Sequence, residues 1–148
     1  MTPINRTKSK SSLFLMEMII TLLFFSIASA VCVQLFAKAH TLSRQAEDLN
    51  FAVAVSQNFA EVMRGTDGTM DSLLEHFPDA EQTGSDTLIQ YYNADFSPCT
   101  ETDAIYTAEV TLTFTNAFQM IQTEVSSLET NEIIYDLSAI KYINTPQG

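Results

Sequence analysis

The carboxylate of Glu17 stands at the start of a long apolar segment, a position that calls for a chemical explanation. The twenty residues that follow it, 18–37, carry no charged side chain. A carboxylate within the apolar part of a bilayer costs about 2.5 to 3.5 kcal/mol on insertion scales, so such a group usually has a partner or a function. Two interpretations follow: Glu17 reaches water at a nearby interface, or it pairs with a cation.

The cysteines and histidines are too few and too far apart to predict a metal site. Cys32 and Cys99 are the two cysteines of the chain, and His40 and His76 are isolated from each other in the sequence. A structural zinc site needs four such ligands close together. We therefore expect no metal site and no cofactor.

Motifs typical of catalysis are also missing from the sequence. It contains no glycine-rich phosphate loop, no nucleophile elbow and no paired His and Asp. Asp67 and Asp71 lack the calcium-loop spacing with its closing glutamate. The remaining acidic residues are scattered, so spacing selects no catalytic carboxylate pair. We expect that the protein is not an enzyme and assign no catalytic residue.

Length and composition fit one domain with an appended segment. The chain has 148 residues, of which 46% are hydrophobic and 17% charged, which is too apolar for a disordered protein. Its net charge of −11 argues against a surface that binds phosphate backbones. No nucleic-acid partner is expected.

Charge is distributed unevenly around the apolar segment. Arg6, Lys8 and Lys10 precede it, whereas residues 39–148 contain three basic and seventeen acidic residues, a net charge of −14. A helix of twenty residues spans roughly 30 Å, the thickness of the hydrocarbon core of a bilayer. The excess of basic residues before the span predicts a single-pass cell-membrane protein with a cytoplasmic N-terminus and an extracytoplasmic C-terminal region.

A conventional secretory signal is the competing interpretation of the same segment. Ala28-Ser29-Ala30 has the small-x-small form of a leader-peptidase site, and cleavage there would release a soluble protein. However, the apolar stretch is longer than a typical signal core of about 7 to 15 residues and continues past Ala30. A lipoprotein site at Cys32 is disfavoured because Val31 is too bulky for the preceding position.

The N-terminal pattern resembles the class III signal of type IV prepilins and pseudopilins. Basic residues of the leader precede a small residue, Ser12, and then an apolar stretch that begins at Leu13 and has Glu17 at its fifth position. This resemblance implies that a prepilin peptidase cleaves between Ser12 and Leu13, that Leu13 becomes an N-methylated terminus, and that Glu17 acts in assembly. It covers roughly the first 64 residues.

Departures from the family pattern indicate a minor subunit. The family usually has Gly and Phe where this chain has Ser12 and Leu13, and Gln34 stands where many major pilins have a helix-kinking proline. The cysteine pair that closes the C-terminal loop of many pilins is also missing. The resemblance therefore implies a minor pilin or pseudopilin of a type IV pilus, competence or type II secretion-like filament.

The same resemblance implies a set of partners. They are the prepilin peptidase, other pilins or pseudopilins, an inner-membrane assembly platform and the lipid bilayer. The alternative hypothesis is a membrane-anchored extracytoplasmic binding or sensor module, for which the helix is only an anchor. Processing at Leu13 distinguishes the two, because a filament subunit must leave the bilayer and a permanent anchor does not.

Helical periodicity continues beyond the apolar span to about residue 64. The apolar residues predict two apolar faces on this helix. The first, an apolar seam, consists of Leu42, Ala46, Leu49, Val53, Ser56, Ala60 and Met63, and the second consists of Phe51, Val55, Phe59 and Val62. Such a helix can cover a sheet with one face and meet neighbouring subunits with the other, or bury both faces in one core. Gly65 and Gly68 are suited to a left-handed helix end. A short helix at 71–77, capped by Asp71, and a loop at 78–86 are expected next.

The last third of the sequence has the pattern of an antiparallel sheet of four strands. Residues 106–115 alternate strictly, with Tyr106, Ala108, Val110, Leu112 and Phe114 on one face, which is typical of a half-buried strand. Further strands are expected at 88–95, ended by Ser97-Pro98, at 120–127 and at 133–142, with Ile133, Tyr135, Leu137 and Ala139 on one side of the last. A turn at 129–131 joins these last two strands.

Together these elements predict an α+β fold, a long N-terminal helix packed on a four-stranded antiparallel sheet, which is similar to the pilin fold. The expected division of the chain is a basic leader peptide at 1–12, a transmembrane helix at 13–38, its amphipathic continuation at 39–64, and an extracytoplasmic loop and sheet domain at 65–148.

Overall fold

A computed structural model of the chain describes residues 7–143, with side chains from residue 11 onward. It contains one long helix and an antiparallel sheet, so the α+β class is confirmed. The chain divides into two compact units, residues 1–45 and residues 46–148.

The long helix α1 runs from Thr7 to Gly65 without interruption. No proline or glycine occurs between Pro3 and Gly65. Every residue of this stretch can therefore donate a backbone hydrogen bond, and none has the low helix propensity of glycine. The helix lies across both units. Its first part forms the described portion of unit 1–45, and its last twenty residues enter unit 46–148.

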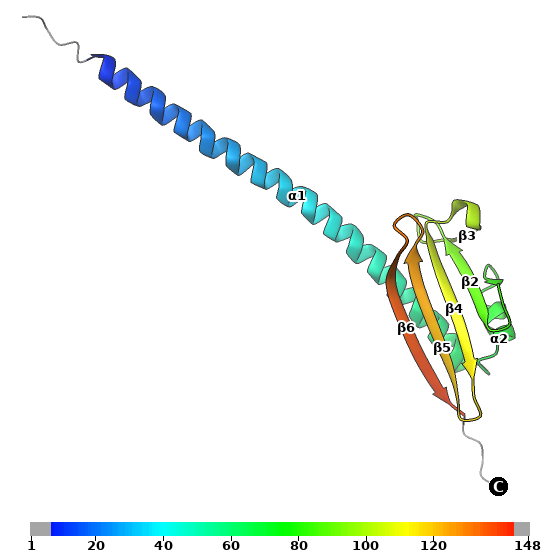
Figure 1. Cartoon of the computed structure of the whole chain (residues 1–148). Coiled ribbons are helices and arrows are strands. Elements are labelled where there is room, and N and C mark those ends of the chain that lie inside the picture. The colour runs from blue at the N-terminus through cyan, green and yellow to red at the C-terminus, as the bar shows by residue number, and fades with distance from the viewer. Residues whose placement is uncertain (1–6, 144–148) are drawn as a thin grey trace, which may run out of the picture. The chain divides into compact units, whose positions relative to one another are not determined.

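Within residues 7–143, six strands form one antiparallel sheet rather than the predicted four. The strands are β1 (Glu81–Gln82), β2 (Thr87–Tyr92), β3 (Pro98–Cys99), β4 (Tyr106–Phe114), β5 (Phe118–Ser127) and β6 (Glu132–Tyr142). Their order is β1-β2-β4-β5-β6, and β3 also pairs with β2. Figure 1 shows the long strands side by side in front of the C-terminal part of α1.

The two additional strands explain the error in strand number. β1 lies in a segment predicted as loop, and β3 begins at Pro98, which was predicted to end the preceding strand. Each has two residues and pairs with one end of β2. Two residues cannot display an alternating pattern, so only the pairing itself identifies them as strands.

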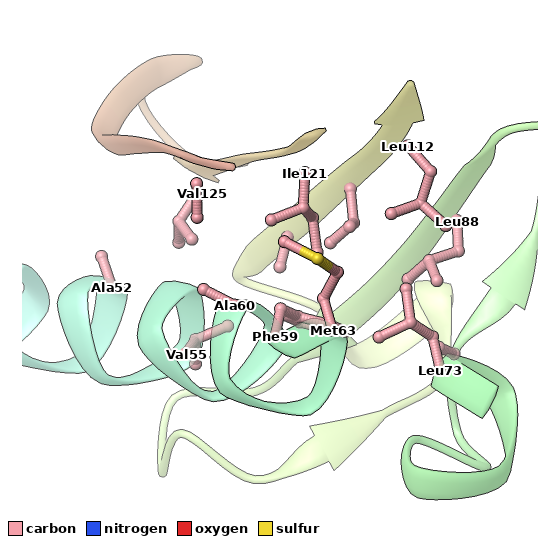
Figure 2. Packing of buried hydrophobic residues seen from close by; sticks show 14 of the residues in the cluster. Ala52, Val55, Phe59, Ala60, Met63, Leu73, Leu88, Leu112, Ile121 and Val125 are labelled. Carbon is pink, nitrogen blue, oxygen red and sulfur yellow. The ribbon is translucent and has the colours of Figure 1, made fainter. Parts of the chain in front are cut away.

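The hydrophobic core lies between the C-terminal part of α1 and one face of the sheet. Figure 2 shows Ala52, Phe59 and Met63 of the helix facing Val125 and Ile121 of β5. Phe59, Met63 and Ile121 are completely buried. The short helix α2 (Met70–His76) completes this core with Leu73, also completely buried.

The alternation predicted for β4 is confirmed over most of its length, but that predicted for β6 fails at Ile133. In β4, Ala108, Val110 and Leu112 are buried, whereas Phe114 at the end of the strand is exposed. In β6, Ile133 is 59% exposed. A register shift between Val125 and Ser126 of the neighbouring strand inserts one extra residue into β6, so Ile133 no longer shares a face with the residues that follow.

The end of α1 also differs from the prediction. Gly68, with φ of 75°, is the glycine in the left-handed region, three residues beyond the end of the helix. A Cβ atom at Gly68 would collide with the Gln119 side chain and lie 3.2 Å from the Met63 carbonyl oxygen. The next helix, α2, is capped by Thr69 rather than Asp71, because the Thr69 hydroxyl accepts the amide of Ser72.

Candidate membrane-spanning and assembly segment

Helix α1 is long and apolar enough to cross a membrane. The apolar side chains of its first part are exposed, for example Phe25 at 73% and Phe36 at 78%. A helix that is apolar on all sides requires an apolar environment, either a protein core or a bilayer. None of this segment is buried inside the described chain, which leaves its apolar surface available to lipid or to other helices.

Hydroxyl groups in the apolar part of α1 are satisfied by the helix itself. The side chains of Thr21, Ser26 and Ser29 each donate to the backbone carbonyl four residues earlier, at 2.7 to 2.8 Å. Thr41 does the same at 3.1 Å. In an apolar environment an unsatisfied hydroxyl costs free energy, and this internal bonding removes that cost without a partner helix.

The residues of the candidate processing and assembly site lie on the first turns of α1. Ser12 and Leu13 are both helical and exposed. Leu13 and Glu17 are four residues apart, so they lie on the same side of the helix. The carbonyl of Glu17 accepts the Thr21 hydroxyl, and its carboxylate is exposed. The first six residues of the expected 1–12 leader lie outside the described residues.

In unit 46–148, one continuous face of α1 is buried. This buried face contains residues from both of the apolar faces that the sequence predicts. Ser56, Ala60 and Met63 of the first seam are buried together with Val55 and Phe59 of the second. Upstream members of the first seam remain exposed: Ala46 is exposed, and Leu49 is 44% exposed. The interpretation that both faces enter one core is therefore correct only near the end of the helix.

An aromatic and polar contact joins α1 to β4 where the buried face begins. The Tyr106 hydroxyl donates to Oδ1 of Asp48 at 2.7 Å. One turn later, the ring of Phe51 stacks on Phe96 with 4.5 Å between centroids and meets Tyr92 edge-on at 5.0 Å. These contacts fix the position of the helix on the sheet.

Phe96 reaches this position through an unusual backbone conformation. Its φ is 58°, which costs about 1 to 3 kcal/mol for a residue with a side chain. The side-chain oxygen of Asn93 holds the turn, because it accepts the amides of Asp95 and Ser97 at 3.0 Å. The turn between β2 and β3 is thus built around the contact of Phe96 with α1.

The other end of the buried helix face is held by β5 and β6. Lys141 of β6 donates through Nζ to the carbonyl oxygens of Met63 and Thr66, the former at 3.3 Å. Its register partner Gln119 donates to the carbonyl of Asp67 at 3.0 Å. Carbonyl groups at the end of a helix lack intrahelical partners and carry partial negative charge, so a lysine there is doubly favourable.

Hydrogen bonding and burial shift the pKa values of several groups in unit 46–148, among them Asp67, Tyr92 and Cys99. The backbone amide and hydroxyl of Thr69, with Ser72, lower the pKa of Asp67, and Lys141 adds to this effect. Burial raises the pKa of Tyr92, as does the nearby charge of Asp79. Desolvation and Asp103 raise the pKa of Cys99, which reduces the thiolate fraction at neutral pH.

No metal-ligating cluster is present in the described part of the chain. No group of three or more His, Cys, Asp or Glu side chains in it could hold a metal ion. Both cysteines, Cys32 and Cys99, are free thiols.

Sequence reasoning missed the polar contacts that hold α1 on the sheet. Asp48 and Lys141 enter the sequence analysis only through the net charge of residues 39–148, although each side chain contacts an element far along the chain. Lys141 is one of three basic residues after residue 38, and it lies between Ile140 and Tyr142. A lone lysine in an apolar strand is the signal that could have suggested a buried acceptor.

Comparisons with protein-family models, with curated proteins and with solved structures found no match to this chain.

Proposed function

We propose that the protein is a minor pilin or pseudopilin, a structural subunit that is stored in the cell membrane and assembles through its N-terminal helix into a type IV pilus, competence or type II secretion-like filament. The observation that carries this proposal is the continuity of α1, in which an exposed apolar segment and a core-forming segment belong to one helix. A long apolar helix and an antiparallel sheet are compatible with a pilin-like fold.

The proposed maturation begins at the junction of Ser12 and Leu13. A prepilin peptidase removes the basic leader there, and Leu13 becomes the N-terminus, which is then methylated. Before cleavage the excess of basic residues near the N-terminus keeps that end cytoplasmic and the sheet domain extracytoplasmic. The exposure of Leu13 supports access by the peptidase.

Glu17 has a defined role in this proposal. Within a bundle of apolar helices its carboxylate loses its hydration, a cost of several kcal/mol unless a cation lies close. The new amine of Leu13 is that cation, on the same chain or on a neighbouring subunit. Their separation of four residues places both groups on one side of α1, which supports the pairing.

Two further observations support release of the helix from lipid into a filament. The hydroxyls of Thr21, Ser26 and Ser29 are satisfied internally, so they impose no fixed partner. Leu42 and Leu49 remain exposed on α1 and can contact neighbouring subunits, other pilins or pseudopilins. Assembly requires an inner-membrane platform that extracts the subunits.

The N-terminus of the membrane-extracted protein tests the processing step. In cells that contain a prepilin peptidase, we expect intact-mass analysis to give a chain that begins at Leu13, with a mass increase for N-methylation. Cells without the peptidase provide the control and should give the leader-containing chain. A chain that begins at Met1 despite active peptidase would support a permanently anchored binding or sensor module, and one that begins at Val31 a secreted protein.

The variant Glu17→Gln tests the assembly step, because it keeps the shape of the side chain and removes its charge. We expect this variant to insert, be cleaved and keep a folded sheet, yet to co-purify with partner pilins at least tenfold less than the parent chain. Glu47→Gln is the matched control, since it removes an exposed carboxylate from the other half of α1. Co-assembly of Glu17→Gln at parental levels would contradict the filament proposal.

A further inference from the structure

The face of the sheet opposite α1 carries an apolar corner at one end of β5 and β6. It consists of Phe118, Met120, Ile140 and Tyr142, in which Phe118 lies opposite Tyr142 and Met120 lies opposite Ile140. These positions alternate with buried residues such as Ile121, so their side chains point away from the core. Ile140 is 43% exposed and Tyr142 76% exposed.

The same face carries an acidic row across three strands. Glu109 of β4 lies directly opposite Glu124 of β5, which lies directly opposite Asp136 of β6. Like charges that face each other across a ladder are destabilising. Glu124 and Met120 are four residues apart along β5, about 13 Å at the usual rise of a strand. The acidic row and the apolar corner therefore lie on one continuous face.

The row between these two features is uncharged. Thr111, Gln122 and Ser138 occupy it in register, one on each of the same three strands. This face is turned toward the viewer in Figure 1, with α1 behind the sheet. Among the described residues of these three strands, the row that separates the acidic row from the apolar corner therefore holds no charged side chain.

The described basic residues of unit 46–148 do not neutralise the acidic row. They are Arg64, which belongs to α1 on the other side of the sheet, and Lys141, whose ammonium group donates to carbonyls at the end of that helix. The repulsion within the row therefore remains in the isolated subunit. A cationic surface laid across the row would relieve it.

We propose that this face docks a partner protein that presents lysine or arginine side chains to Glu109, Glu124 and Asp136 and apolar side chains to the apolar corner. Charge complementarity selects this occupant. A second copy of the chain would bring the same acidic region, with three basic against seventeen acidic residues after residue 38, toward the row. Anionic lipid headgroups would be repelled in the same way.

This inference rests on the sheet alone and is independent of cleavage at Leu13 or of the role of Glu17. A chain that proves to be a permanent anchor would still present the face. Failure of the filament proposal and failure of this docking proposal are therefore separable by experiment.

A probe peptide tests the proposal with the full chain in nanodiscs of neutral lipid. The probe is a synthetic extended peptide with lysine at positions 1 and 3, isoleucine at positions 5 and 7 and serine at positions 2, 4 and 6, so that lysines and isoleucines share one face. In the matched peptides, either the isoleucines are replaced by serine or the lysines by glutamate. We expect the lysine and isoleucine peptide to bind at least tenfold more tightly than either matched peptide. Its affinity should fall as the salt concentration rises, because the charge contribution is screened.

Variants locate the binding on the proposed face. Combined Glu109→Gln, Glu124→Gln and Asp136→Asn should weaken binding at least tenfold, and combined Ile140→Ser and Tyr142→Ser at least fivefold. The control combines Glu61→Gln, Glu75→Gln and Glu101→Gln, which remove three exposed acids elsewhere and change the net charge by the same amount. This control should change the affinity less than twofold. A photocrosslinker at Gln122 should capture the peptide, whereas one at the exposed Gln57 of α1 should not.

Several outcomes would overturn the proposal. An equal loss of affinity in the control combination would show only general attraction to an acidic protein. Equal binding of the glutamate and isoleucine peptide, or equal capture from Gln57, would contradict the assigned face. A dimer of the parent chain that is lost in the Tyr142→Ser variant would show that the occupant is a second copy.

Discussion

The two parts of α1 have the same backbone conformation but differ in how their apolar side chains are arranged. Between residues 18 and 37, apolar residues lie on every side of the helix and are exposed, as Phe25 illustrates. After residue 50, one side carries the buried Phe59 and Met63 and the other carries exposed polar residues. The comparison shows that helix formation alone does not decide the environment of a segment. The distribution of apolar side chains around the axis does.

Because of this difference, the two parts of α1 contribute to stability in different ways. The second part gains free energy by removing apolar surface from water within its own chain. The first part has no such partner in the described chain and gains only when lipid or other helices cover it. Mutations should therefore affect folding of the sheet unit in one part and membrane insertion or assembly in the other.

The largest expected effect comes from matched phenylalanine truncations in the two parts. Phe59→Ala should lower the free energy of unfolding of the sheet unit by about 3 to 5 kcal/mol, because it removes a completely buried ring and leaves a cavity. Phe25→Ala should change it by less than about 0.5 kcal/mol. Urea unfolding in micelles, followed by fluorescence of the five tyrosines, all within residues 91–142, measures both.

Equal destabilisation by Phe59→Ala and Phe25→Ala would break the comparison, because it would mean that the apolar part supports the sheet unit. Membrane association of the same two variants is the complementary measurement and tests the comparison further. Membrane association should be unchanged in Phe59→Ala, whose side chain lies outside the apolar segment.

A smaller effect is expected at the contact that holds the end of α1. Lys141→Met keeps most of the apolar stem but removes the charged donor to the Met63 and Thr66 carbonyls. We expect a loss of about 2 kcal/mol in the free energy of unfolding, typical of a hydrogen bond from a charged group. Lys38→Met, in the first part of the helix, is the control and should leave that free energy unchanged. A loss below about 0.5 kcal/mol for Lys141→Met would show that the contact adds no stability.

How much of this fold the sequence could predict depended on the length of each pattern. The uninterrupted helix and the alternation of Ala108, Val110 and Leu112 extend over many residues, and both were identified. β1 and β3 were missed because two residues carry no period. The bulge in β6 was missed because it depends on the pairing with β5, so Ile133 was placed on the wrong face.

The candidate sites show the same limit. Glu17 could be proposed as an assembly residue because a charge in an apolar stretch is visible in the sequence alone, and its role stays a prediction. The acidic row was not, because Glu109, Glu124 and Asp136 become neighbours only through the strand register. Lys141 is separated in the sequence from its two acceptors, Met63 and Thr66, by 78 and 75 positions. No local sequence pattern can predict a contact between residues so far apart.

The smallest expected effect concerns the pH dependence of the turn that follows α1. The Asp67 carboxylate accepts the Thr69 amide at 3.1 Å and the Thr69 hydroxyl at 2.9 Å, and these bonds hold its pKa below the ordinary value of 3.8. In the unfolded chain the carboxyl has its ordinary pKa, so folding favours the ionised form. The stabilisation is therefore complete above pH 3.8 and is lost as the pH falls through the lower pKa of the folded state.

Asp67→Asn tests this linkage when urea unfolding is repeated at several pH values. The difference in free energy of unfolding between the parent and Asp67→Asn should be constant near neutral pH and should shrink as the pH falls below 3.8, since the parent then loses the ionised acceptor. Glu75→Gln, an exposed acid of α2, controls for the removal of one charge. Because Asp67 is exposed to solvent, the effect should be smaller than that of Lys141→Met. A difference that grows as the pH falls would have the wrong sign for a lowered pKa, and it would mean that the Thr69 bonds do not favour the ionised carboxylate.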